Sequence, residues 1–366
     1  MKITCLIDAL NLGGAQRAAL LLLEGLSSRG HEITLTTFDP AMPDFYRLKP
    51  GINRVKLPVE PGICRWFDLR CQTRRFRALK ACVSAQAPDL IISFIDTANV
   101  LTLAAFPSGR PPVIVCEQVN PLHWRIGPHW SLLRRALYPL SAAVVMLTED
   151  TARWAASLRP GWPAVHIPNP VVPPVYSENI SRPAFFGQDR NLVALGRLHE
   201  QKGFDMLITA FASVAGRFPR WQLTIIGEGP ERKNLESLIR GSGLSGRVAL
   251  PGVSEKPSDA LRYADLFVMS SRYEGFGMVL AEAMACGLPA VSFDCPSGPG
   301  SMIRHGVDGL LVRPGDVAGL GSALAELMGD EEKRVRMASR ASEIVERFSY
   351  GKYLDDWEKL IRSAVG

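Results

Sequence analysis

Short apolar runs alternate with amphipathic stretches along the first half of the chain. The runs are typical of strands buried on both faces, and the stretches between them repeat apolar residues at helical spacing. The pattern predicts strands at Lys2–Ile7, 32–38, Leu90–Phe94, Val113–Cys116 and 143–147. It predicts helices at residues 15–28, 71–85, 98–105 and 132–140. Strands and helices that alternate in this way form a parallel sheet with helices on both faces.

A proline-rich segment interrupts this pattern. Residues 168–174 read PNPVVPP, and proline favours an extended linker because it fixes φ and lacks an N–H donor. The alternation then starts again, with strands predicted at 192–195, 222–226, 248–250, Leu266–Met269 and Ala290–Phe293. Helices are predicted at 205–217, 231–241, 257–263, 278–286, 317–328 and 331–347, with a last amphipathic helix at 352–364.

The sequence therefore predicts an α/β protein with two doubly wound, Rossmann-like domains that face a central cleft. We place the first domain at residues 1–170 and the second at 171–349, and we expect the helix at 350–366 to pack back on the first domain. Ligands of such sheets bind at the carboxyl ends of the strands, so the cleft is the expected site.

Composition excludes several other classes of protein. The 366 residues are 47% apolar and 21% charged, which is typical of a soluble globular chain. No apolar run approaches the roughly 18 residues of a spanning helix, and Asp8 interrupts the apolar start before a signal-peptide core can form. The seven cysteines include no CxxC pair, so neither a disulfide framework nor a metal site is predicted. We expect a cytoplasmic chain.

The net charge of +6 lies entirely in the first half of the chain. Between residues 65 and 80, basic side chains are interleaved with Trp66, Phe67 and Phe76. Cations and aromatics on one short amphipathic segment suit an anionic membrane surface, whereas a solvated helix face is the alternative. The predicted membrane-facing residues are Arg70, Arg74, Arg75 and Arg77. No nucleic-acid motif accompanies them, so nucleic acid is not an expected partner.

Two loops that follow predicted strands contain residues suited to phosphate. Gly13 and Gly14 open the first helix, where backbone N–H groups can approach an anion; a tight turn is the alternative. In the second domain, residues 196–203 read GRLHEQKG and begin at Gly196. Arg197 and Lys202 then bracket one turn, and two cations in that arrangement suit a diphosphate.

The segment 271–283 (SRYEGFGMVLAEA) combines two carboxylates with a helix start. Glu274 falls in the loop and Glu282 on the helix, too far apart to share a proton as a hydrolase pair. Between them, the N–H groups of Gly275, Phe276 and Gly277 begin a helix and favour an anion. The order of carboxylate, helix N-terminus and carboxylate matches that of sugar, diphosphate and ribose in a nucleotide sugar.

These motifs resemble the retaining GT-B glycosyltransferases of family 4. The segment EGFGMVLAE is similar to that family's E-x7-E element, GRLHEQKGFD to its phosphate loop, and Gly13-Gly14 to its amino-terminal glycine loop. CGLPAVSFDCPSGP and GVDGLLVRPGD extend the resemblance over nearly all of residues 190–320. The resemblance implies that Arg197 and Lys202 neutralise the leaving diphosphate, that Glu274 contacts donor-sugar hydroxyls, and that Glu282 contacts the ribose.

The resemblance also implies catalysis without a metal or a resident cofactor, since the nucleotide sugar is a substrate. Backbone groups near Val253 are expected to hold the base. Relatives commonly carry His or Arg after the fourth strand of the first domain, where this chain has Gln118. An amide can contact a sugar or acceptor hydroxyl but cannot stabilise positive charge, and a merely structural role for Gln118 is the alternative.

The predicted function is transfer of a hexose or N-acetylhexosamine from a nucleotide sugar to a lipid-linked, polyprenyl-diphosphate saccharide. It would serve cell-surface polysaccharide or glycan assembly at the inner face of the membrane. UDP-sugars are the favoured donors and GDP-mannose is the alternative. Two other functions are a sugar-nucleotide epimerase of the same architecture and a nucleotide-sugar-binding regulator without turnover. The first lacks a well-placed acid or base, and the second would not require Arg197, Lys202, Glu274 and Glu282 together.

Overall fold

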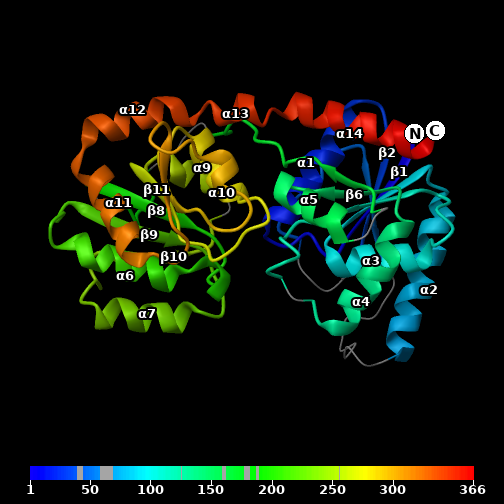
Figure 1. The fold of residues 1–366 in the computed structure, drawn as a ribbon, viewed down its shortest axis with the longest axis horizontal. Coiled ribbons are helices and arrows are strands. Elements are labelled where there is room, and N and C mark those ends of the chain that lie inside the picture. Colours follow the sequence, from blue (N-terminus) through cyan, green and yellow to red (C-terminus); the bar gives the residue numbers. More distant parts are fainter. Residues whose placement is uncertain are drawn as a thin grey trace. The chain divides into compact units, whose positions relative to one another are not determined.

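The computed structural model divides the chain into two compact units, residues Met1–Pro170 with Gly351–Gly366, and residues Val171–Tyr350. It describes residues 1–38, 44–57, 69–124, 126–158, 162–176, 182–186, 189–254 and 256–366. Each unit contains one parallel sheet with helices on both faces (Figure 1). The fold is therefore α/β with two Rossmann-like sheets, which is the GT-B architecture.

The first unit contains a sheet with the strand order β3-β2-β1-β4-β5-β6-β7. Its strands are β1 (Lys2–Ile7), β2 (Glu32–Thr37), β3 (Ile52–Lys56), β4 (Leu90–Phe94), β5 (Val113–Cys116), β6 (Ala143–Met146) and β7 (Ala164–His166). Its helices are α1 (Gly14–Ser28), α2 (Leu69–Gln86), α3 (Asp96–Ala105), α4 (Pro128–Leu137), the short η1 (Tyr138–Leu140), α5 (Glu149–Leu158) and α14 (Tyr350–Val365). Neighbouring strands pair in parallel, so their carboxyl ends share one edge.

The last helix, α14, packs on this first unit (Figure 1). Its apolar face is buried at Leu354, Trp357 and Ile361. On its polar side Asp355 and Glu358 pair with Arg29, which follows α1, at 2.7 and 3.3 Å. These pairs are partly exposed and contribute little each, so burial of the apolar face supplies most of the attachment.

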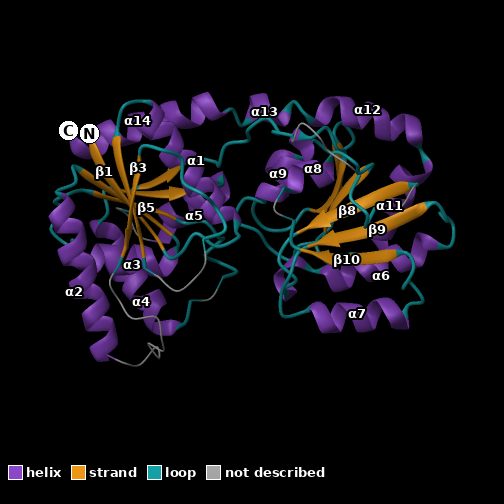
Figure 2. Cartoon of the chain, turned by 180° about the vertical axis from the view of Figure 1, so that it is seen from behind, coloured by secondary structure: helices purple, strands orange, loops and turns teal. Residues whose placement is uncertain are grey.

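The second unit contains a sheet with the order β10-β9-β8-β11-β12-β13. Its strands are β8 (Arg190–Leu195), β9 (Trp221–Ile226), β10 (Val248–Gly252), β11 (Leu266–Met269), β12 (Ala290–Phe293) and β13 (Gly309–Val312). Its helices are η2 (Glu200–Lys202), α6 (Phe204–Ala215), α7 (Arg232–Gly241), α8 (Pro257–Leu261), α9 (Met278–Ala285), α10 (Pro299–Met302), α11 (Val317–Gly329), α12 (Glu331–Ala341) and α13 (Ile344–Arg347). Figure 2 shows α6 and α9 on opposite sides of this sheet.

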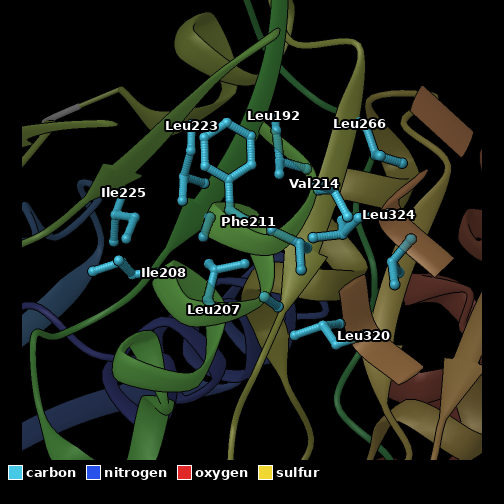
Figure 3. Close-up of a cluster of buried hydrophobic side chains, with 14 of the residues drawn as sticks. Leu192, Leu207, Ile208, Phe211, Val214, Leu223, Ile225, Leu266, Leu320 and Leu324 are labelled. Atoms are coloured by element: carbon cyan, nitrogen blue, oxygen red, sulfur yellow. The ribbon is translucent and has the colours of Figure 1, made fainter. Parts of the chain in front are cut away.

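Alternate strand residues build the core of the second unit. Leu192, Leu223 and Leu266 point from three neighbouring strands towards α6 and α11, where Phe211 and Leu324 meet them (Figure 3). All five side chains are fully buried. Because the opposite face of the sheet is also covered, the strands contain continuous apolar runs, and this is why the sequence reveals them.

The structure also corrects several sequence predictions. Edge strands β3, β7 and β13 were not predicted, because short or half-exposed edge segments carry a weak apolar signal. The helix α5 was not predicted either. The single helix predicted at 331–347 is wrong, since the helix ends at Ala341 and α13 begins at Ile344. At this interruption Glu343 pairs with Arg304 at 2.8 Å, a contact that periodicity does not reveal.

Candidate active site

Two neighbouring strands of the second unit, β8 and β11, bring the predicted phosphate loop and the predicted sugar loop together at their carboxyl ends. The backbones approach so closely that glycine is required at Gly203, where φ is +62° and a Cβ atom would lie 2.1 Å from the carbonyl oxygen of Ser270. The Ser270 hydroxyl donates to the carbonyl of Lys202 at 2.9 Å. The two loops therefore form one structure, although Lys202 and Ser270 are 68 positions apart in the sequence.

Lys202 and Glu274 meet at this point. Lys202 Nζ lies 2.6 Å from Glu274 Oε1, and the side chains are only 17% and 7% exposed. The Ser271 hydroxyl donates to the same oxygen at 2.6 Å. Among the described residues, both hydrogen bonds to this carboxylate end on Oε1, which leaves Oε2 able to accept from a ligand hydroxyl. Removing one member of such a buried pair leaves an uncompensated charge and costs about 3–5 kcal/mol.

Arg197 differs from Lys202 in its surroundings. Its side chain is exposed and makes no ion pair within the part of the chain that the structure describes. The preceding residue, Gly196, lies against Gly227 of the next strand end, where a Cβ on Gly227 would be 1.9 Å from the carbonyl oxygen of Gly196. The loop thus presents two different cations, since Lys202 is held in an ion pair and Arg197 extends into solvent.

Arg272 is a residue of this site that sequence reasoning missed. Its guanidinium forms a two-pronged bond to Asp205 at 3.0 and 2.8 Å, and this bond lowers the pKa of Asp205. The same guanidinium donates to the carbonyl of Glu200 at 2.6 Å, and Gln201 Nε2 donates to the carbonyl of Tyr273 at 3.0 Å. These contacts connect the phosphate loop to the sugar loop. The paired charges Arg272 and Asp205 are visible in sequence, but only the fold brings them into contact.

The helix α9 begins directly after the sugar loop. Its N-cap is Gly277, with φ +94° and no side chain that caps the first N–H groups, so those donors remain available to an anion. Gly275 and Phe276 before it are buried, and Glu282 on the helix is half-buried. Val253, which follows β10, is 43% exposed.

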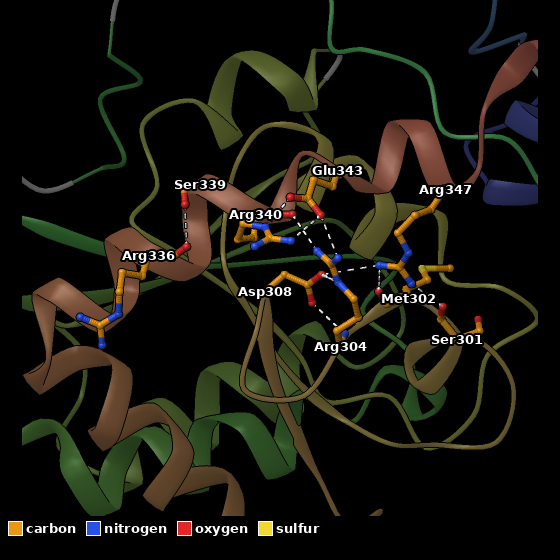
Figure 4. A network of polar contacts seen from close by, with 9 residues as sticks. All are labelled: Ser301, Met302, Arg304, Asp308, Arg336, Ser339, Arg340, Glu343 and Arg347. Atoms are coloured by element: carbon orange, nitrogen blue, oxygen red, sulfur yellow. Dashed lines mark hydrogen bonds and ion pairs between the residues drawn. The ribbon is translucent and has the colours of Figure 1, made fainter.

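A network of charged residues joins Asp308, α10 and the segment that follows α12 (Figure 4). Asp308 is fully buried and accepts from Arg304 Nε at 2.6 Å, with Arg347 Nη1 at 3.5 Å. Arg347 also donates to the carbonyls of Met302 and Ser301 in α10. The next residue, Phe348, packs edge-to-face on Phe276 with ring centroids 5.4 Å apart. The segment after α12 thus contacts both the sugar loop and the neighbouring α10.

In the first unit, the glycine loop leads from β1 into α1. Gly13 is the N-cap of α1, its backbone is extended, and Gly14 is the first helical residue. The side chain of the buried Gln16 folds back over Gly13, where a Cβ atom would lie 2.3 Å from Gln16 Oε1. Gln16 Nε2 in turn donates to Asp8 at the end of β1, at 3.2 Å.

Gln118 lies two residues after β5 and is half-buried. Asn169, itself buried, donates from Nδ2 to Gln118 Oε1 at 3.3 Å. The side-chain oxygen of Gln118 is therefore engaged by a neighbouring side chain of the same unit.

The predicted membrane-facing residues lie on α2. Arg74 and Arg77 are exposed, Arg75 is half-buried, and the opposite side of the helix packs into the core through Leu79 and Val83. The side chain of Arg70 and the residues Trp66 and Phe67 lie outside the described part of the chain.

Two features are absent from the described residues. They contain no cluster of three or more histidine, cysteine or acidic side chains that could hold a metal ion. Across the same residues, no helix is both long and apolar enough to span a bilayer.

Comparisons with known proteins identify the family. Residues 176–344 match the family model of glycosyl transferases group 1, and residues 13–170 match that of the glycosyl transferase 4-like domain. Because the two matches span both units, the chain belongs to the group 1 glycosyltransferases. It is a glycosyltransferase, an enzyme that transfers hexosyl groups.

Three individual proteins illustrate the similarity. One relative is the Campylobacter jejuni α-1,4-N-acetyl-D-galactosaminyltransferase that acts on GalNAc-α-(1→4)-GalNAc-α-(1→3)-diNAcBac-PP-undecaprenol. The two sequences are 26% identical over 99% of this chain and 98% of that protein. The chain is 37% identical to an exopolysaccharide phosphotransferase of Streptomyces coelicolor, over 74% of this chain but only 28% of that protein. The solved structure of Anabaena HepE with UDP-glucose superposes with a TM-score of 0.77 at 20% identity, covering 99% of this chain and 100% of that one.

Proposed function

We propose that the chain is a retaining, metal-independent glycosyltransferase that moves a hexose or N-acetylhexosamine from a UDP-sugar to a lipid-linked, polyprenyl-diphosphate saccharide. The observation that carries this proposal is the Lys202–Glu274 pair, which places a cation and a free carboxylate oxygen at one strand edge. A nucleotide sugar needs this combination, since its diphosphate is anionic and its sugar offers hydroxyl donors.

Each charged residue has a role in this proposal. Arg197 and Lys202 neutralise the diphosphate as it leaves, and the first N–H groups of α9, after Gly275, Phe276 and Gly277, bind a phosphate oxygen. Glu274 Oε2 accepts from a sugar hydroxyl while Oε1 keeps the Lys202 ammonium in place. Glu282 accepts from the ribose, and the backbone near Val253 holds the base.

The reaction then needs no enzymic nucleophile. The acceptor hydroxyl oxygen bonds to the anomeric carbon as the bond from that carbon to the phosphate oxygen breaks. The acceptor proton passes to the departing phosphate oxygen, and the nucleoside diphosphate leaves. Two cations and a helix N-terminus stabilise the developing negative charge where other transferases use a metal ion. Attack from the face that the leaving group vacates retains the anomeric configuration.

The lipid-linked acceptor is supported by the Campylobacter relative and by the surface of α2. Arg74 and Arg77 face solvent there, and α4, which shares α3 as a packing partner with α2, exposes Leu132 and Leu133 beside Arg135. Exposed cations next to exposed leucines suit the interface of an anionic membrane. We infer that the enzyme works on the inner face of the membrane, which adjoins the compartment where nucleotide sugars are made.

The test is release of nucleoside diphosphate from a panel of UDP- and GDP-sugars, with and without a polyprenyl-diphosphate-saccharide extract. The proposal predicts release from one UDP-sugar that depends on the extract. Release from GDP-mannose instead would correct the donor, and extract-independent turnover would contradict the lipid-linked acceptor. Binding of the nucleotide without turnover of any donor would favour a regulator.

A further inference from the structure

A hollow of about 380 Å³ lies at the amino edge of the second sheet. Three neighbouring strands, β9, β8 and β11, begin there, at the tails of the arrows of β8 and β9 in Figure 2. Because β8 is six residues long, this edge is about 20 Å from the carboxyl edge that holds Lys202. The hollow is therefore separate from the proposed donor site of the same unit.

Arginine side chains dominate the lining of this hollow. The lining contains four arginines and two aspartates, an excess of two positive charges. They are Arg182, Arg190, Arg220, Arg262, Asp189 and Asp265. Since the net charge of the chain lies entirely in its first half, this excess is a local concentration of cations in a half that is neutral. A hollow lined mainly by one sign of charge attracts ions of the other sign.

Arg190 and Asp265 are held in place by the strands themselves. Arg190 Nη1 donates to Asp265 Oδ1 at 2.7 Å, and Asp265 Oδ2 accepts from the backbone N–H of Asn191 at 2.8 Å. Arg190 also pairs with Glu331, which lies 3.8 Å from Arg334. These two guanidinium groups and two carboxylates balance one another. This part of the lining therefore gives the hollow a fixed wall without adding to its net charge.

The pair formed by Arg220 and Asp189 is also balanced. Arg220 Nε lies 3.2 Å from Asp189 Oδ1, and the two side chains are 75% and 51% exposed. Arg182 donates from Nη2 to the backbone carbonyl of Asp189 at 3.2 Å. The excess charge of the hollow therefore belongs to Arg182 and Arg262.

Arg262 is exposed and has no carboxylate partner. Its guanidinium makes no ion pair or hydrogen bond with any residue that the structure describes. It lies instead over the ring of Tyr176, 5.2 Å from the ring centroid. Stacking on a ring orients the planar guanidinium and leaves the N–H groups at its edge able to donate to a ligand.

We propose that this hollow binds the phosphate group of a small phosphate monoester, with Arg262 and Arg182 as its main contacts. Such a group carries nearly two negative charges at neutral pH, which match the excess of two positive charges. Its oxygens accept the paired N–H groups of a guanidinium, an arrangement that arginine offers and lysine does not. A carboxylate, with one charge, would leave the hollow positive. The volume lies at the small end of ligand sites, and the phosphate group can belong to a soluble ester or to a lipid headgroup.

Calorimetric titration of the full-length protein with glycerol 3-phosphate tests the site. The titration is made at pH 8, where the ester is a dianion, with ionic strength kept constant by sodium chloride. Wild type should bind the ester, and Arg262→Gln should bind it at least about tenfold more weakly, because one charge-assisted contact is lost. Arg262→Lys should fall between the two, since it keeps the charge without the planar fork.

The matched control is Arg217→Gln. It removes another exposed arginine of the second unit that lies over a ring, that of Phe218 at 5.5 Å, and it should bind the ester as wild type does. Both glutamine variants replace exposed side chains, so they should fold. If Arg262→Gln does not fold, the comparison of wild type with Arg262→Lys decides the same question.

Vesicles that contain phosphatidate carry the same phosphate ester on a lipid and distinguish the two sources. Binding of glycerol 3-phosphate that depends on Arg262 supports a soluble ester, and binding of the vesicles alone that depends on Arg262 supports a lipid headgroup. Equal binding by wild type and both glutamine variants, or no binding of either probe, would overturn the proposal. Phosphate that binds at the Lys202 edge does not depend on Arg262, so the result is independent of the proposed function.

Discussion

The carboxyl edges of the two sheets have similar topology but differ in the balance of their charged side chains. In the second unit, cations and carboxylates occur in contacting pairs, Lys202 with Glu274 and Arg272 with Asp205, close enough to solvent to meet a ligand. In the first unit, the carboxylates Asp96 and Glu117 share one guanidinium in a buried cluster. The fold fixes where a site lies, whereas the residues at each strand end decide whether the edge binds charge or responds to pH.

The largest effect should come from removing both cations of the second edge. Arg197→Ala with Lys202→Ala should lower transfer by more than about 1000-fold, because both side-chain cations that stabilise the leaving diphosphate are removed. The matched control is Arg220→Ala with Lys233→Ala, which removes the same charge from exposed positions and should retain turnover. Equal activity in the two double variants would separate these cations from the reaction.

Glu274→Gln should lower kcat by about 100- to 1000-fold. The amide cannot balance the Lys202 ammonium, and a neutral oxygen accepts more weakly from a sugar hydroxyl. Because the carboxylate is buried in an ion pair, this variant should also unfold at a lower temperature, which a loop residue without contacts would not produce. Steady-state kinetics and calorimetry measure both effects, and wild-type values in each would remove Glu274 from the site.

In the first unit, Glu117→Gln should change how stability depends on pH. The folded pKa of about 7 exceeds the unfolded value of 4.5, so the folded state binds the extra proton between these values and wild-type stability falls as pH rises through them. Relative to the variant, wild type should lose about 3 kcal/mol from pH 4 to pH 8.5. Urea unfolding of both proteins across this range measures the difference, and parallel curves would refute the raised pKa.

The smallest effect should come from the surface of α2. Arg74→Glu with Arg77→Glu should weaken binding to anionic vesicles by about 1 kcal/mol for each positive charge removed, and added salt should have the same direction of effect. Vesicle flotation measures this, with Arg217→Glu and Arg220→Glu in the second unit as the control. Flotation that equals wild type would mean that this face of α2 is only solvated.

Some of the second edge could be predicted from sequence because its residues lie in short motifs. Glycines next to charged residues after an apolar run mark a strand end, and Arg197, Lys202 and Glu274 are found this way. The contact between Lys202 and Glu274 was not predicted, and nor was the support from Arg347 and Phe348. Pairings across about 70 residues depend on strand order, which periodicity does not specify.

The first edge was harder to predict. Glu117 stands beside Gln118 in sequence, yet nothing in the pattern shows that its carboxylate points inwards to Tyr138 and Arg134. Arg134 in particular belongs to a stretch that looks like a solvated basic helix, and the structure buries it. Burial of a charged residue against neighbouring elements leaves no local signal, since it results from packing between segments far apart in the chain.

Calorimetric binding of UDP to wild type, Glu274→Gln and the Arg197→Ala, Lys202→Ala double variant tests the central assignment most directly. UDP contains the diphosphate and the ribose but lacks the sugar that is transferred. The account predicts that Glu274→Gln binds UDP within about threefold of wild type, while the double variant binds it at least about 100-fold more weakly. Equal losses in both variants, or an unchanged affinity in the double variant, would contradict the division of this strand edge into a diphosphate-binding part and a sugar-binding part.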